Sequence, residues 1–512
     1  MTSTWYKSRS RYTNRKYDDA SKAQASPPPP LGNLVQTIEI SDLDMNLNSK
    51  IASPSIRDCR LITSYNWLEG KEAAPTILVP GKSAVIRASE MLLTECLFLT
   101  IGKPPLWAPV ASPSRLNEDN GTYFRDKNAA RFPKHPLEPC VIAAMEADNN
   151  ISPEVDIVAC GSTLGNLLRF VRRQDKPFRI LVEKIHNTVF FTRRENTPTE
   201  IIPGVRGYGH SFPEANTIWE PDVKGSASHQ RIVRYTFGGH RILVRFEADG
   251  YIKPHAQGPS SVNSTSSTTV KDQTSLADLL SEADMGLASQ TTATLAESTI
   301  NVKFGGELIP QAQVFDLKTR SIYTKDKKDH LAEELPRLWV SQTPTFILAF
   351  HTQGLFKKAD IQIKDVREDV QRWELDHQAE LAQLKSLIDM IIEVVSDMPD
   401  QKMELRYAGI GGLEVRERLA DVNDALSDAV KARWGLQGGA LTDESDDGVG
   451  EPETQGSDHD SFDPETDVNE DDSDEDHRYS HDNLYGYDYE EELPDYTACS
   501  ADECGYCGKC PY

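Results

Sequence analysis

Long apolar runs are missing from this sequence: nowhere do 18 or more apolar residues follow one another, so we expect no membrane-spanning helix. The N-terminus carries Lys and Arg without the apolar stretch of a secretory signal peptide. Cysteine is scarce as well, because four of the eight are scattered and four lie within the last fourteen residues. This distribution excludes a secreted disulfide scaffold and predicts a soluble intracellular protein, in the nucleus or the cytoplasm.

Basic residues are fewer than acidic ones, but the excess of acidic residues lies mostly at the C-terminal end of the sequence. The formal net charge is -25 over 512 residues. Residues 441–512 hold 25 Asp and Glu against only Arg478 and Lys509, a net of -23 that leaves -2 for residues 1–440. The body is therefore close to neutral, and its charge does not exclude nucleic acid as a ligand. The acidic run resists packing, so we expect residues 441–495 to be disordered and open to a protein partner.

Composition divides the chain into a body and several appended segments. We expect a disordered basic and Pro-rich arm (1–34), one α+β domain (35–440) with a disordered Ser/Thr-rich insertion (252–300), the acidic tail (441–495) and a Cys-rich terminal motif (496–512). Within the domain, Gly81-Lys82 recurs as Gly102-Lys103 around a segment that is apolar and unlike its surroundings. Residues 82–102 are either a retained intron or a helical insertion.

Two short segments rich in β-branched and aromatic residues organise the body. The first is His240–Asp249, where Glu247 and Asp249 are two residues apart, and the second is Ala312–Lys318, which ends in Asp316-Leu-Lys. Because side chains alternate along a strand, each pair is expected on one face. Three carboxylates and one lysine can then converge. A hard divalent cation prefers carboxylate oxygens, and a lysine beside it can orient a water for attack on a phosphodiester.

The remaining pattern alternates strands with helices and predicts a mixed β-sheet core flanked by helices. Between Glu154 and Glu195 the order is strand, helix opening at Gly161, and a strand pair turning near Asn187. Asp369 to Met398 has sustained helical periodicity and predicts the longest helix. A helix following the break at Pro213 places Glu214 in its first turn.

In order and texture these segments resemble the decapping exoribonuclease family, the DXO-like branch of the PD-(D/E)xK nuclease superfamily, as a divergent fungal-type member. The similar segments cover roughly residues 150–370 and are Asp156–Leu168, Leu181–Phe191, Gly207–Glu214 (its Gly-x-x-x-Glu), Arg231–Asp249 (its Glu-x-Asp), Asp316–Lys318 (its Glu-x-Lys) and Trp339–Gln342 (its Trp-x-x-Gln). The resemblance implies a nuclease-like α+β fold.

The family removes incomplete caps from RNA 5′ ends, and many members then degrade the RNA with Mg²⁺ or Mn²⁺. The resemblance therefore implies four carboxylates as metal ligands, namely Glu214, Glu247, Asp249 and Asp316. It also implies that Lys318 and Gln342 position the nucleophile and the scissile phosphate. The chain departs from the family where Cys160 or Gly161 stands in place of the motif arginine, and where Asp replaces Glu at 316.

Four thiols end the chain in the pattern Cys499-x₄-Cys504-x₂-Cys507-x₂-Cys510. Zinc accepts four thiolates in a tetrahedron, so the motif predicts a zinc site. Consecutive x₂ spacings are also found in iron–sulfur ligation, and a flexible thiol-rich tail is a further alternative.

Two functions stay open at this point. The surviving acids and lysine favour a weak metal-dependent RNA 5′-end nuclease or pyrophosphohydrolase, whereas the missing arginine favours a catalytically decayed module that binds RNA or a protein. A prenyl diphosphate synthase is excluded, because that chemistry needs two facing Asp-Asp-x-x-Asp motifs on helices. The nearest match, Asp471–Glu475, lies in the acidic tail.

Overall fold

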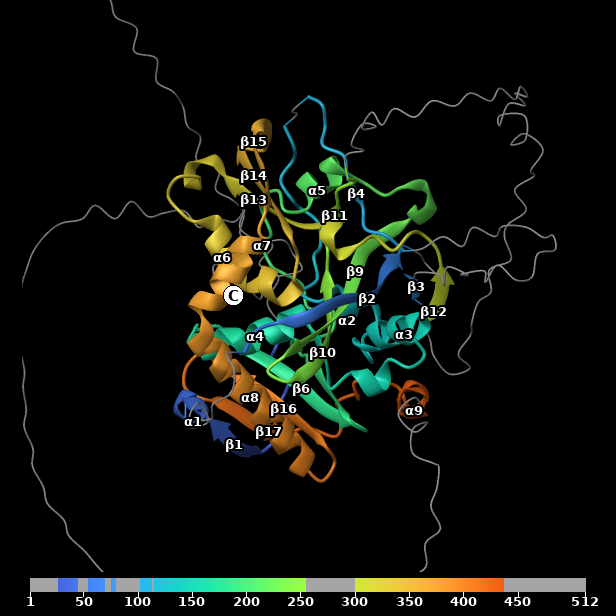
Figure 1. The fold of residues 1–512 in the computed structure, drawn as a ribbon, viewed down its shortest axis with the longest axis vertical. Coiled ribbons are helices and arrows are strands. Elements are labelled where there is room, and N and C mark those ends of the chain that lie inside the picture. Colours follow the sequence, from blue (N-terminus) through green and yellow to red (C-terminus); the bar gives the residue numbers. More distant parts are fainter. Residues whose placement is uncertain are drawn as a thin grey trace, which may run out of the picture. The chain divides into compact units, whose positions relative to one another are not determined.

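Two β-sheets form the core of the computed structural model, which describes residues 26–44, 54–69, 75–79, 102–112, 115–254 and 300–436, all within one compact unit (Figure 1). The larger sheet has the order β1 (Leu34–Ile38), β17 (Leu413–Glu417), β16 (Lys402–Tyr407), β6 (Phe178–Ile185), β7 (Thr188–Arg193), β5 (Ile157–Cys160), β10 (His240–Glu247), β9 (Ser226–Phe237), β2 (Arg57–Leu68), β3 (Thr76–Val79) and β12 (Asn301–Phe304). The smaller sheet has the order β15 (Leu355–Asp365), β14 (Thr345–Thr352), β13 (Val314–Ser321), β11 (Gly250–Tyr251), β4 (Leu106–Trp107) and β8 (Thr217–Ile218).

Parallel and antiparallel pairs occur in both sheets. In the larger sheet β5 pairs in parallel with β7 and β10, while β10 and β9 are antiparallel. In the smaller sheet β13 runs parallel to β14 and antiparallel to β11. The expected fold class, a mixed sheet core flanked by helices, is confirmed.

Helices cover both faces of the larger sheet. Their bounds are α1 (Ile40–Asp44), α2 (Lys127–Arg131), α3 (Glu138–Ala147), α4 (Gly161–Val171), α5 (Ser211–Asn216), α6 (His330–Ser341), α7 (Arg367–Asp376), α8 (Gln378–Asp397) and α9 (Asp428–Leu436). Alternate residues of the central strands enter two different cores, so that Ile242 and Val244 pack with α4 and α8 while Leu243 packs with α3 and α9. The short strand β5 is buried along its whole length because both of its faces are covered, which explains its continuous apolar run.

The chain passes from one sheet to the other within a few residues. Strand β10 ends at Glu247 in the larger sheet, and β11 begins at Gly250 in the smaller one. The described chain stops at residue 254, three residues after β11 ends at Tyr251, and it resumes at residue 300. The predicted acids of β10 therefore lie where the two sheets join.

Three expectations need correction within the described residues. Residues 26–34 pack on the body, since Arg179 donates to the carbonyls of Pro29 (2.6 Å) and Pro30 (3.0 Å). The long helix is two helices, α7 and α8, that meet at His377, whose ring stacks on Trp373. The expected insertion does not begin at residue 252, because Ile252 donates its N–H to the Gln313 carbonyl at 2.9 Å.

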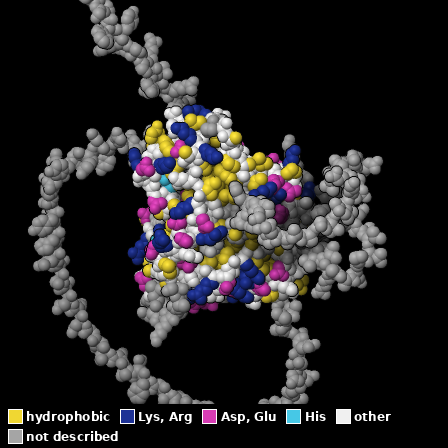
Figure 2. Space-filling view, turned by 45° about the horizontal axis from the view of Figure 1, so that its top comes forward, with side chains coloured by type: hydrophobic (Ala, Val, Ile, Leu, Met, Phe, Trp, Pro, Cys, Tyr) yellow, Lys and Arg dark blue, Asp and Glu magenta, His cyan; other side chains and the backbone are white. Residues whose placement is uncertain are grey.

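The other segment predictions lie outside the described residues. These are residues 1–25 of the arm, 255–299 of the insertion, 80–101 around the apolar repeat, and the acidic and Cys-rich segments after residue 436. Within the described residues no helix is long and apolar enough to span a bilayer. On the face shown in Figure 2, Lys and Arg are interspersed with Asp and Glu, in keeping with a body that is close to neutral.

Candidate functional site

Glu247, at the end of β10, is held by two neighbours. Its Oε1 accepts from the Lys127 ammonium at 3.1 Å, and its Oε2 accepts from the Gln230 amide at 3.3 Å. Lys127 is the first residue of α2, whose N-cap Asp126 accepts from two backbone N–H groups of the first turn. The helix start thus places an ammonium against the predicted metal ligand.

Asp249 lies beyond the end of the strand, so alternation along β10 does not extend to it. Its Oδ2 accepts the backbone N–H of Leu317 on β13 at 2.6 Å. Burial first, and then the charge of Asp316, raise the pKa of Asp249 to about 7. The two aspartates therefore lie close enough to oppose each other's ionisation.

Asp316 and Lys318 share one face of β13, as predicted, while Phe315 and Leu317 on the other face pack in a separate apolar core. Facing them is α6. Both carboxylate oxygens of Asp316 accept from Arg337, whose Nε donates to Glu334 at 3.0 Å. Burial raises the pKa of Asp316 even beside the guanidinium. Asp249, Asp316 and Lys318 are thus brought together.

The other two predicted residues lie elsewhere. Gln342 ends α6 with a left-handed φ of 51°, and its amide donates to the Trp339 carbonyl at 2.6 Å, which caps the helix. Glu214 is in the first turn of α5, as predicted, but its side chain is exposed and its charge acts on Tyr123. Tyr123 in turn stacks on His210, with ring centroids 3.7 Å apart.

These contacts test whether the predicted ligands fit a divalent cation. Carboxylates that hold Mg²⁺ or Mn²⁺ must turn lone pairs toward one point. Arg337 donates hydrogen bonds to both oxygens of Asp316, and Lys127 forms an ion pair with one carboxylate oxygen of Glu247. Within the described ranges no group of three or more His, Cys, Asp or Glu side chains could hold a metal. As arranged here, the four acids do not fit the cation, and the metal site stays a prediction; the four tail cysteines lie outside the described residues.

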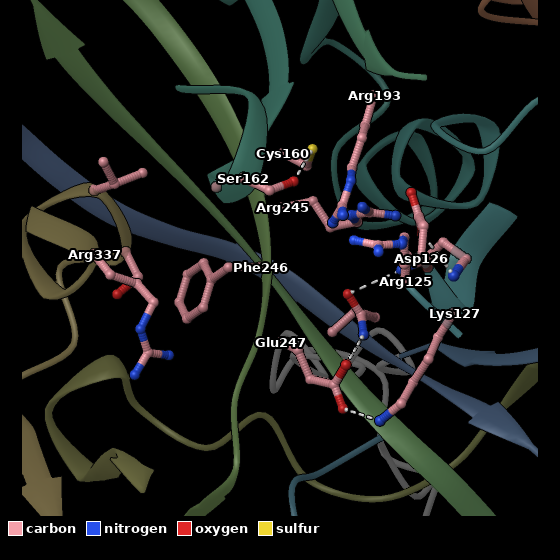
Figure 3. A pocket seen from close by; sticks show the side chains of 15 residues that line it. Arg125, Asp126, Lys127, Cys160, Ser162, Arg193, Arg245, Phe246, Glu247 and Arg337 are labelled. Carbon is pink, nitrogen blue, oxygen red and sulfur yellow. Dashed lines mark hydrogen bonds and ion pairs between the residues drawn. The ribbon is translucent and has the colours of Figure 1, made fainter. Parts of the chain in front are cut away.

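A pocket beside these residues is rich in arginine (Figure 3). Its cavity volume is about 60 Å³, and five of its lining residues are cations against two anions. The cations are Arg125, Lys127, Arg193, Arg245 and Arg337, and the anions are Asp126 and Glu247. Figure 3 shows the side chains of Arg125, Arg193 and Arg245 pointing toward one another, with Arg337 on the other side of Phe246. Cys160 and Gly161 lie in the same lining.

Arg245 is the most deeply buried of the three converging arginines. It is 6% exposed, and its Nε has no hydrogen-bond partner among the described residues. Its contacts are the Pro136 carbonyl at 3.4 Å and the Tyr65 hydroxyl, and within the described chain it forms no ion pair. A buried charge is ordinarily paired. Arg245 therefore lacks an ion pair in the described chain, and Asp126 is a nearby carboxylate whose charge favours its cationic form.

Sequence reasoning missed all of these arginines. Arg193 ends β7, Arg125 precedes the cap of α2, and Arg245 lies on β10 two residues before Glu247. Only Arg245 carried a usable signal, because two residues along a strand share a face. The other two converge through tertiary structure, which periodicity does not reveal.

Comparisons with solved structures give likenesses of low identity. Schizosaccharomyces pombe Rai1 in complex with 3'-FADP has a TM-score of 0.40 at 11% identity, covering 75% of this chain and 99% of that one. Candida albicans Rai1 in complex with pU5-Mn2+ has a TM-score of 0.43 at 9% identity, covering 78% and 99%. Scheffersomyces stipitis Rai1 in complex with (3'-NADP)+ and calcium ion has a TM-score of 0.44 at 10% identity, covering 80% and 100%.

Comparison with curated proteins finds no match. A family model matches residues 37–405, which is more than half of the chain and includes β5, β10 and β13 with the residues described above. By this match the chain belongs to the family described as "Domain of unknown function (DUF8563)".

Proposed function

We propose that this chain binds the phosphorylated 5′ end of RNA in the arginine-lined pocket and acts as a binding module rather than as an efficient nuclease. The observation that carries the proposal is the convergence of Arg125, Arg193 and Arg245, with Arg245 buried and without an ion pair in the described chain. A guanidinium presents a planar fork of donors that matches a phosphate group.

The nature of the anion follows from the resemblance. The decapping exoribonucleases act on RNA 5′ ends and carry a motif arginine where this chain has Cys160 or Gly161. Both residues line the pocket, so the missing arginine belongs to the same place. Three arginines from other elements supply positive charge there instead. We infer that phosphate recognition was retained by different residues.

The test compares two short RNAs of one sequence, with a 5′-monophosphate or a 5′-hydroxyl, by fluorescence anisotropy in EDTA. We expect the phosphorylated RNA to bind more tightly, and Arg245→Met to abolish the preference. A hydrogen bond between charged groups contributes about 1.5–3 kcal/mol, so the preference should fall about 10- to 150-fold.

Arg241→Met is the matched control for this experiment. It removes an arginine from the same strand, but Arg241 is half-exposed and paired with Asp156. We expect it to bind both RNAs as the wild type does. Equal binding of the two RNAs by the wild type, or an unchanged preference in Arg245→Met, would refute the proposal.

Metal-dependent hydrolysis of RNA 5′ ends is the second candidate. It is favoured by the meeting of Asp249, Asp316 and Lys318. Its signature is slow release of nucleotides from 5′-monophosphate RNA in Mn²⁺ that is lost in Asp249→Ala and in Lys318→Ala. Release that survives both substitutions points to a contaminant, and no release at all favours the binding module. A protein partner for the acidic tail stays a prediction.

A further inference from the structure

Six charged side chains fill the space between β13 and α6. Three are acids (Asp249, Asp316 and Glu334) and three are bases (Lys318, Arg320 and Arg337). All but Asp249 are at most 5% exposed. The charges of Lys318, Arg337 and Arg320 hold the pKa of Glu334 below its usual value although burial opposes them. The set is therefore balanced in charge by residues of the chain alone.

Arg337 is the centre of this set. Its Nη1 and Nη2 donate to the two oxygens of Asp316, and its Nε donates to Oε2 of Glu334 at 3.0 Å. The remaining oxygen of Glu334 accepts from Arg320 at 3.2 Å. One planar guanidinium thus joins two carboxylates in the fork geometry that arginine favours.

A divalent cation would have to compete with this arrangement. It would need lone pairs of Asp316 that already face the two Nη atoms of Arg337. Placing it there without moving the arginine would bring like charges together in a buried space. Asp249 is a second acid near Asp316, and one of its oxygens accepts the Leu317 N–H. Asp249 and Asp316 therefore lie close together, but Arg337 already contacts both oxygens of Asp316.

We propose that Arg337 takes the place of a divalent cation at Asp316 and Asp249, so that this acid pair is satisfied without a metal ion in the wild-type chain. The proposal goes beyond the proposed function, which rests on Arg125, Arg193 and Arg245. It predicts that a metal site is latent in the chain and appears when the guanidinium is removed.

The experiment measures the melting temperature of the full chain with and without 1 mM Mn²⁺ in the wild type and in Arg337→Ala. We expect no shift for the wild type. For Arg337→Ala we expect a rise of about 3–4 °C, the effect on a folded body of this size of a ligand present at about a hundred times its dissociation constant. The acidic tail is common to both proteins, so ions held there contribute equally.

Two further variants localise the ion. Arg337→Ala combined with Asp316→Asn should lose the rise, because a ligand is missing. Arg320→Ala is the matched control, since it removes a buried arginine from the same set without releasing Asp316. We expect it to gain no stability in Mn²⁺.

Two results would overturn the inference. A wild-type melting temperature that rises in Mn²⁺, with the rise lost in Asp316→Asn, would show that the metal binds beside Arg337. A folded Arg337→Ala that gains nothing in Mn²⁺ would show that the acids do not form a cation site. The comparison of wild type with Asp316→Asn decides the question even if Arg337→Ala does not fold. RNA binding in EDTA is read separately, so failure of this inference is distinct from failure of the proposed function.

Discussion

Replacing Arg245 by methionine is expected to stabilise the protein in phosphate-free buffer while it removes the preference for 5′-phosphate RNA. The reason is that one of its hydrogen-bond donors has no partner in the part of the chain that the structure describes. The Nε is buried without a partner among the described residues, which costs about 1–3 kcal/mol. Methionine keeps most of the apolar stem and carries no charge. The substitution therefore removes a penalty from the folded state.

Two contacts are lost in the same change. The bond to the Pro136 carbonyl is long, at 3.4 Å, and contributes little. The hydrogen bond with the Tyr65 hydroxyl contributes about 0.5–1.5 kcal/mol, and Tyr65 keeps its bond to Asn128 at 2.7 Å. The net expectation is a gain of about 1 kcal/mol, or about 1–1.5 °C in melting temperature.

Urea unfolding of the full chain measures this free energy, with Arg241→Met as the control. Arg241 is paired with Asp156, so its loss should destabilise slightly or leave stability unchanged. Inorganic phosphate at 10 mM should raise the stability of the wild type and not that of Arg245→Met. If Arg245→Met loses more than about 1 kcal/mol in phosphate-free buffer, the arginine is satisfied within the protein, and the argument for an anion site fails.

Three further predictions concern other parts of the chain. Glu220 accepts from Lys103 and Lys253, each at 2.8 Å, and these ammonium groups hold its pKa at about 2, below the usual 4.5, although burial opposes them. A lowered carboxyl pKa contributes stability that is fully present above about pH 4.5 and is lost as the pH falls toward 2. The free energy of unfolding of Lys103→Met should therefore fall less than that of the wild type between these two pH values. Parallel curves of unfolding free energy against pH for the two proteins would contradict this. Gly354 has a φ of 81°, and a Cβ there would lie 2.6 Å from the Leu116 carbonyl oxygen, whereas Gly239, with a φ of 96°, has no atom within 4 Å. Gly354→Ala should therefore cost about 1–3 kcal/mol more in urea unfolding than Gly239→Ala, and equal losses would show that the close approach yields. At the C-terminus, removal of residues 496–512 should lower the zinc content by one ion per chain in elemental analysis, and equal contents would exclude the cysteine site.

The sequence predicted the parts of the fold that depend on local periodicity. The order of β5, α4, β6 and β7 was expected, since a fully apolar strand followed by Gly161 and a turn near Asn187 are local signals. The shared face of Asp316 and Lys318 was expected for the same reason. The break between α7 and α8 at His377 was not predicted, because the sequence has helical periodicity on both sides of it. The stacking of the His377 ring on Trp373 is a tertiary detail that periodicity does not show.

The site was less accessible to sequence reasoning, because its geometry depends on where the chain changes sheets. Alternation along a strand predicts a shared face for Glu247 and Asp249 only if the strand continues. It ends at Glu247, and Asp249 joins β13 instead. Arg125, Arg193 and Arg337 come from three separate parts of the chain, and their spacing in the sequence does not predict that they line one pocket.

The charged groups on the two sides of Phe246 differ in their balance of positive and negative charge. Between β13 and α6, three acids meet three bases, so the buried charge is already balanced and a further ion is not required. In the pocket, the four cations other than Arg337 meet two anions, and Arg193 is also paired with Glu195. Arg245 is buried without an ion pair in the described chain. An excess of buried positive charge destabilises the protein until an anion binds. Under the two proposals, phosphate recognition needs only this excess, so RNA binding is expected in EDTA and does not depend on a metal ion at the acids that Arg337 contacts.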